Sequence, residues 1–103
     1  MKKPKKIKHS QTTQKLENRL IATIEKVKSL SEELTGFVNV NYTVKYDNFP
    51  NSLLVHCTFD TETNLAQAKV EEVNYQKNLH KLLFKQGIVL KNSSHNLVFI
   101  LES

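Results

Sequence analysis

Lysines dominate the first nine residues, MKKPKKIKH, which contain no acidic side chain. Lysine clusters bind nucleic acid by displacing the counterions around phosphates, so this segment predicts electrostatic binding with little base reading. Five simultaneous phosphate contacts would give a logarithmic salt slope of about −4 to −5. A solubilising arm that meets polyanions only incidentally is the alternative interpretation. The candidate residues are Lys2, Lys3, Lys5, Lys6 and Lys8.

A second set of lysines lies near the end of the chain. Lys77, Lys81 and Lys85 are spaced by four residues, which places them in one stripe on a helix, with His80 and Lys91 close in the sequence. Phe84 projects beside this stripe rather than into the main apolar direction. An aromatic ring among lysines is typical of a base-stacking or partner-docking spot, and the alternative is a flank of the core packed under a strand or loop.

The remaining polar residues do not form a recognisable catalytic or metal site. The four histidines lack zinc-ligand spacing, and Cys57 lies on the apolar face of its segment, where it is expected to behave as a small apolar residue. Two isolated glycines cannot make a phosphate-binding loop. The sequence therefore predicts no enzyme activity, metal or cofactor. The histidines are His9, His56, His80 and His95.

The segment LVFIL near the end of the chain is apolar without alternation. A strand of this kind must be covered on both faces, so a homodimer formed by sheet packing or edge pairing is one interpretation. A central strand, or a loop crossing over it, is the other. The predicted interaction residues are Phe84, Leu97, Phe99 and Leu101.

Hydrophobic periodicity predicts the elements that position these residues. A helix is expected over about 12–34, with Gly36 as its cap, and an antiparallel hairpin is expected from strands over 38–46 and 53–59. Asp60 or Thr61 can cap a following helix. The polar face of the hairpin lacks the aromatic residues that RNA-recognition sheets use for stacking. That face reads Asn39, Asn41, Thr43 and Lys45, with His56 and Thr58 opposite.

The second helical region is expected to be broken. Along a single helix Lys69, Glu72 and Gln76 would fall on the buried line. We therefore predict two helices, over about 61–70 and 74–86, with a break near 70–74 and an end at Gly87. After that glycine, IVL and LVFIL are compatible with a hairpin or with one bent strand. The sequence does not decide between these two arrangements.

Together these features predict a disordered basic arm over residues 1–10 and a single α+β domain over 11–103. Its order is helix, strand, strand, one or two helices and one or two strands, with an antiparallel or mixed sheet and helices on one face. The formal net charge of +5 belongs to the arm, because ten basic and ten acidic residues balance over positions 9–103. One cysteine and the lack of a long apolar run favour a cytoplasmic protein without membrane spans.

This element order resembles type II KH modules and, in its broken helix and final strand, ribosome-binding factor A. The resemblance covers about residues 12–101. The GxxG loop with which RNA-binding KH domains clamp the backbone is missing, since Gly36 and Gly87 are the only glycines. A plain two-layer sandwich of two αββ halves explains the same order.

A second resemblance lies in the sequence itself. The stretch KYDNFPNSLLVHCTFDTETNLAQA, followed by a helix and GIVL, resembles short gammaproteobacterial proteins labelled Fis family regulators, whose core is FPxSLxVxCxFDT. The match covers residues 45–68 and 79–90 and implies a bacterial origin. True Fis proteins read DNA with a C-terminal helix-turn-helix, whereas this chain ends in the strand-like LVFILES.

The sequence thus leads to two hypotheses from different classes. The first is a small non-catalytic protein that binds DNA or RNA non-specifically through the arm and the stripe of Lys77, Lys81 and Lys85. The second is a protein-interaction module or homodimer without a nucleic-acid role.

Overall fold

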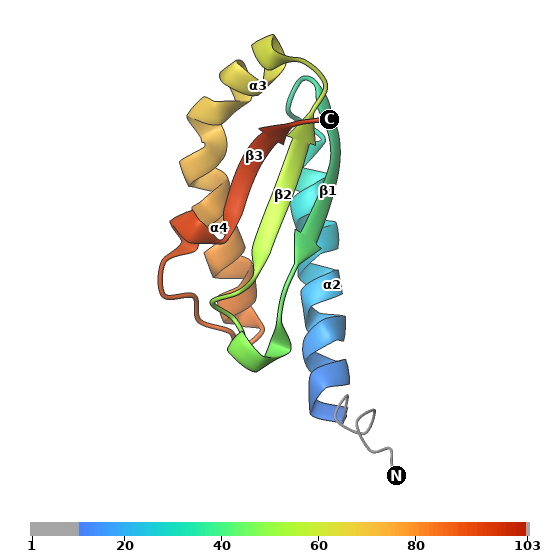
Figure 1. Ribbon diagram of the computed structural model, residues 1–103, viewed down its shortest axis with the longest axis vertical. Helices are drawn as coiled ribbons and strands as arrows, with labels where there is room; N and C mark the ends of the chain where they lie inside the picture. Colours follow the sequence, from blue (N-terminus) through green and yellow to red (C-terminus); the bar gives the residue numbers. More distant parts are fainter. Residues whose placement is uncertain (1–10, 103) are drawn as a thin grey trace.

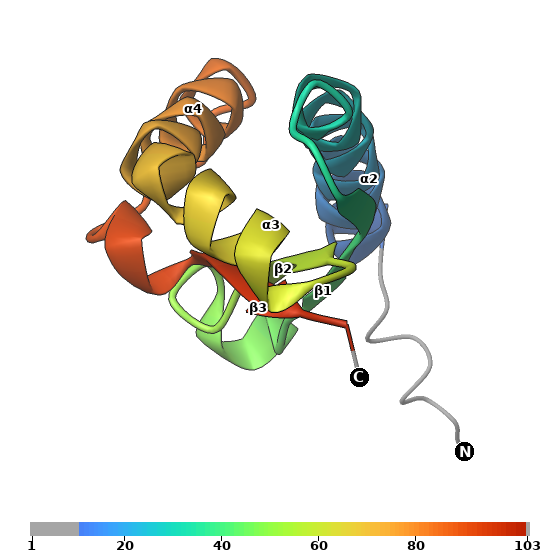
Figure 2. The ribbon, with the colours of Figure 1, turned by 90° about the horizontal axis from the view of Figure 1, so that it is seen from above.

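The computed structural model describes residues 11–102. These residues form a three-stranded sheet with helices on one face, as Figures 1 and 2 show. The α+β class and the one-sided arrangement of helices predicted from sequence are confirmed. In chain order the elements are α2 (Gln11–Ser31), β1 (Phe37–Thr43), η1 (Tyr46–Asn48), β2 (Leu54–Phe59), α3 (Glu62–Ala68), η2 (Lys69–Glu71), α4 (Glu72–Lys85), η3 (Ser93–His95) and β3 (Leu97–Leu101).

The sheet has the order β1-β2-β3, with β1 antiparallel and β3 parallel to the central strand β2. We expected an antiparallel or a mixed sheet, and these pairings make it mixed. The pairing of Asn39 with Thr58 and of Asn41 with His56 confirms the predicted polar face of the hairpin. Within residues 11–102, the helices α2, α3 and α4 all lie on the opposite face (Figure 2).

Helix α2 buries a stripe that faces the sheet. The residues of this stripe recur at the spacing of a helix that packs on one side. Leu30 lies off the stripe and is exposed. The helix ends at Ser31 instead of Leu34, because the chain tightens into turns in which Leu34 N–H donates to the Ser31 carbonyl at 2.9 Å. Leu34 still packs against the core from this turn. The buried stripe consists of Leu20, Thr23, Ile24, Val27 and Ser31.

The predicted break of the second helical region is confirmed, but it lies at Lys69–Glu71, slightly earlier than expected, and the second helix begins at Glu72. The Thr61 side chain caps α3 by accepting from Asn64 N–H at 3.1 Å, and η2 then separates α3 from α4. The break was predicted so that polar residues would avoid the buried line, and this reason was wrong for two of them. Glu72 and Gln76 were expected to leave the buried line, yet both side chains turn toward β3 and bond to it.

The last segment differs from both arrangements considered. Ile88 and Leu90 are buried, but they lie in a loop and form no strand, and β3 alone follows η3. Asn92 fixes the turn by accepting from Ser94 N–H at 3.1 Å, and the buried Asn96 side chain donates to the Leu53 carbonyl at 2.7 Å. Because residues 88–92 form no strand, residues 88–101 contain no hairpin, and β3 pairs with β2 instead.

The core fills the space between the sheet and the helices. Phe99 of β3 contacts two rings, Phe59 at a centroid distance of 5.1 Å and Tyr75 of α4 at 5.5 Å. The Tyr75 hydroxyl donates to the Leu30 carbonyl at 2.9 Å, which links α4 to the end of α2. These contacts fix the orientation of α4 and therefore decide which of its side chains face solvent.

Candidate nucleic-acid interface

The stripe of Lys77, Lys81 and Lys85 lies on the solvent side of α4. All three side chains are exposed, whereas Leu79 and Leu83 on the opposite side are fully buried. Among the described residues the ion pair found is that between Lys69 and Glu72, so none of the stripe lysines is neutralised by a nearby carboxylate there. The stripe is thus an unpaired row of ammonium groups.

The charge of the folded chain is unevenly distributed, although its total is balanced. Residues 73–101 contain four lysines, two histidines and no aspartate or glutamate. This segment forms most of α4, the following loop and β3. A ligand that approaches α4 from its solvent side therefore meets a field of one sign, which favours polyanions.

Phe84 and His80 lie beside this stripe. Phe84 is 61% exposed, which confirms that its ring projects away from the core. The ring centroids of His80 and Phe84 are 6.3 Å apart with planes inclined by 31°. These two residues, with Lys81 and Lys85, line an open hollow of about 310 Å³. Lys91 lies elsewhere, in a smaller polar hollow with Asn51 and His95.

A residue that the sequence analysis missed ties α2 to this region. The Arg19 guanidinium donates to the Gln86 carbonyl, at the C-terminal cap of α4, over 3.3 Å. The third turn of α2 therefore lies within reach of the C-terminal end of α4, in the lower part of the molecule in Figure 1. Residues 1–10 precede α2, so the basic arm is joined to the domain at the end where Lys85 is exposed. Arg19 carried no sequence signal beyond its place on a helix.

The five arm lysines, Lys2, Lys3, Lys5, Lys6 and Lys8, lie outside the described residues. The structure therefore places only the point of attachment of the arm.

The predicted interaction residues fall into two groups. Phe84 is exposed and Leu101 is 38% exposed, but Leu97 and Phe99 are buried in the core beneath the helices. The register of β3 places these two side chains beside buried side chains of β2 on the helical face, so neither is accessible to a partner in this fold. On the other face of the strand, Val98 and Ile100 are partly exposed.

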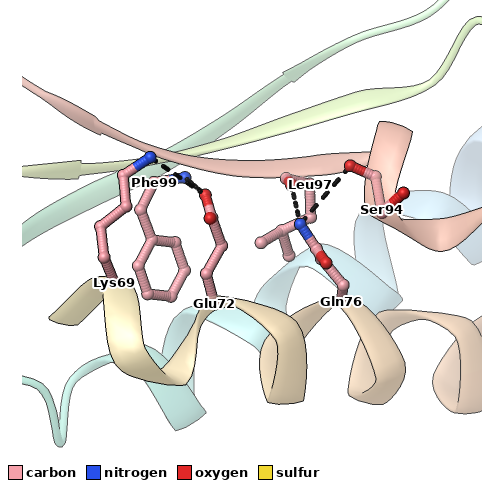
Figure 3. Close-up of polar contacts among 6 residues, drawn as sticks. All are labelled: Lys69, Glu72, Gln76, Ser94, Leu97 and Phe99. Carbon is pink, nitrogen blue, oxygen red and sulfur yellow. Dashed lines mark hydrogen bonds and ion pairs between the residues drawn. The ribbon is translucent and has the colours of Figure 1, made fainter.

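The outer edge of β3 is partly occupied by α4 (Figure 3). Glu72 Oε2 accepts from the Phe99 N–H at 2.8 Å, and Gln76 Nε2 donates to the Leu97 carbonyl at 3.0 Å. Exposed strand edges pair readily with other chains, and side chains bonded to them block that pairing. Homodimer formation through this part of the edge is therefore opposed by the fold.

Cys57 is buried, as the sequence predicted for a small apolar side chain. Burial raises the pKa of its thiol to about 11, because the thiolate would lose its hydration. The thiol is thus in an unreactive protonated form at neutral pH. Within residues 11–102 no group of three or more acidic, histidine or cysteine side chains is arranged to hold a metal ion. None of the helices there is long and apolar enough to cross a membrane.

Comparison of the chain with protein-family models, curated proteins and solved structures finds no match. The resemblances to KH modules and to the proteins labelled Fis family regulators stay predictions.

Proposed function

We propose that this chain is a small non-catalytic, cytoplasmic bacterial protein that binds DNA or RNA through phosphate contacts. The basic arm and the stripe of Lys77, Lys81 and Lys85 make these contacts. The observation that carries the proposal is the unpaired stripe on the acid-free segment 73–101. The contact between α2, which follows the arm, and the end of α4 supports joint use of both basic regions.

The mechanism is neutralisation of phosphate charge with release of counterions, with little reading of base sequence. Replacing all three stripe lysines with glutamine removes up to three phosphate contacts. The logarithmic salt slope of binding is then expected to become shallower by about 2 to 3. The measurement is fluorescence anisotropy of labelled duplex DNA at a series of salt concentrations.

A matched control separates contact from net charge. Replacing Lys28, Lys45 and Lys69 with glutamine changes the net charge equally, at positions outside α4. We expect that variant to keep a slope close to that of the unmodified chain. Equal losses in the two triple variants would contradict the role of the stripe.

A second candidate function, a protein-interaction module or homodimer, is favoured by the helix-free face of the sheet. Leu54, Val98 and Ile100 are partly exposed on that face, and α2, α3 and α4 all lie on the other face (Figure 2). Buried apolar contacts persist at high salt, because salt does not screen them. Sedimentation of a dimer at high salt would support this function, and a monomer at high concentration would contradict the homodimer.

A further inference from the structure

His80 and Phe84 lie one helical turn apart on α4 and form a pair of neighbouring rings. Their centroids are 6.3 Å apart, and the small angle of 31° between the planes means that both rings incline in similar directions. The exposure of Phe84 differs sharply from that of the two core phenylalanines. Phe59 and Phe99 are 0% and 1% exposed, whereas Phe84 is 61% exposed. The exposed face of Phe84, beside the His80 ring, is available for stacking with a flat group of a ligand.

The charges around these rings favour one kind of ligand. Lys81 and Lys85 line the same hollow as His80 and Phe84, and the nearest acidic residue along the chain before them is Glu72, which bonds to β3. A ligand that fits this surface offers a flat apolar group together with negative charge. A nucleotide does so, because its base has a stacking face and its phosphate is anionic.

We infer that His80 and Phe84 form a stacking platform for an unpaired base of a single-stranded nucleic acid, with Lys81 and Lys85 on the adjacent phosphates. This inference rests on the proposed function and adds a substrate class to it. Bases within a duplex are already stacked and paired, so they do not present a free face to an exposed ring on a helix. Single strands therefore bind in preference to duplex, without sequence preference, since every base can stack.

The test uses the full chain and three fluorescent probes in anisotropy titrations. The probes are a thymidine strand of about 12 nucleotides, an abasic sugar-phosphate strand of the same length, and the matching thymidine–adenosine duplex. Phe84→Leu keeps an apolar side chain but removes the ring. Val73→Ala, three helical turns earlier on the same side of α4, removes another exposed apolar side chain and serves as the control.

The platform predicts that Phe84→Leu weakens binding of the thymidine strand at least about fivefold, since one stacked base contributes at least that much. Binding of the abasic strand and the duplex is expected to stay unchanged, as is every affinity of the Val73→Ala variant. Equal binding of the thymidine and abasic strands, unaffected by Phe84→Leu, would overturn the platform and leave the phosphate-binding function intact. Binding to none of the three probes would overturn both.

A spectroscopic readout adds a measurement that does not depend on affinity. The chain contains no tryptophan, so Phe84→Trp introduces a single indole at the platform. Stacking predicts quenching of its fluorescence by the thymidine strand and no change with the abasic strand at saturation. The same response to both strands would contradict base contact at this position.

Discussion

The Glu72 carboxylate accepts a hydrogen bond from the Phe99 amide at 2.8 Å (Figure 3). A side chain of α4 thus bonds to the edge of β3 where the backbone of another strand could otherwise pair. Gln76, one turn later, donates a hydrogen bond through Nε2 to the Leu97 carbonyl of the same edge at 3.0 Å. The apolar strand β3 would otherwise offer these groups to another chain. Helix α4 thus completes the sheet edge while its opposite side presents the lysine stripe.

Removing both edge contacts should destabilise the fold and promote association. In a Glu72→Ala, Gln76→Ala variant the Phe99 N–H and the Leu97 carbonyl lose their partners, at a cost of about 1 to 3 kcal/mol for each group that stays buried. We expect a lower urea midpoint and concentration-dependent sedimentation. Lys69→Ala, which removes the 3.6 Å ion pair of a half-exposed lysine with Glu72 but leaves both edge contacts in place, should change stability by less than about 1 kcal/mol. A double variant that stays monomeric and as stable as this control would contradict the role of the two side chains.

The two glycines provide a matched pair for stability. Both have φ near +84°, but a Cβ on Gly36 would lie 2.5 Å from Asn64 Cβ, whereas one on Gly87 would have no neighbour within 4 Å. Gly87→Ala should cost about 1 to 2 kcal/mol from backbone strain alone. Gly36→Ala should cost more, because the start of α3 must also move. Urea denaturation of both variants measures this difference, and equal losses would argue against the close packing at Gly36.

The buried thiol of Cys57 predicts a loss of stability in alkali. Its folded pKa of about 11 exceeds the ordinary value of 9.0, so on raising the pH the unfolded chain releases its thiol proton first. The contribution is intact below pH 9 and falls by roughly 2 kcal/mol as the pH rises toward 11. Burial also raises the pKa of Tyr75, which adds to the loss at higher pH.

Comparison with Cys57→Ala isolates the thiol. That variant should be less stable at pH 7 because of its cavity, but its free energy of unfolding should decline less between pH 9 and 11. The measurement is urea denaturation at a series of pH values. Parallel pH profiles for the two chains would show that the thiol does not contribute.

Local patterns predicted most of the elements, because helix and strand periods and glycine caps are encoded in neighbouring residues. The stripe lysines and the exposure of Phe84 followed directly from the helical period of residues 72–85. The polar face of the hairpin followed from alternation within two adjacent strands, and the register of Asn39 with Thr58 confirmed it.

The non-local features could not be derived in this way. Gln76 on a buried line was interpreted as a sign of a broken helix. Its hydrogen-bond partner, the Leu97 carbonyl, lies 21 residues away and could not be recognised from the local sequence. Only the position of β3 at the sheet edge explains a buried amide there. The register of β3 with β2 buries Leu97 and Phe99. Because the run LVFIL is apolar throughout, its sequence does not show which side chains face the core. The contact of Arg19 with Gln86 depends on helix packing and has no local signature.

The most direct test of nucleic-acid binding compares the full chain, a chain that begins at Ser10 and the triple variant of the stripe. The chain that begins at Ser10 keeps every residue of the core, so it should fold. Fluorescence anisotropy with labelled RNA and DNA is measured at low and at near-physiological salt. We predict binding by the full chain at near-physiological salt that weakens markedly when either basic region is lost. Binding that vanishes at this salt, or that is unaffected by both changes, would contradict a nucleic-acid function.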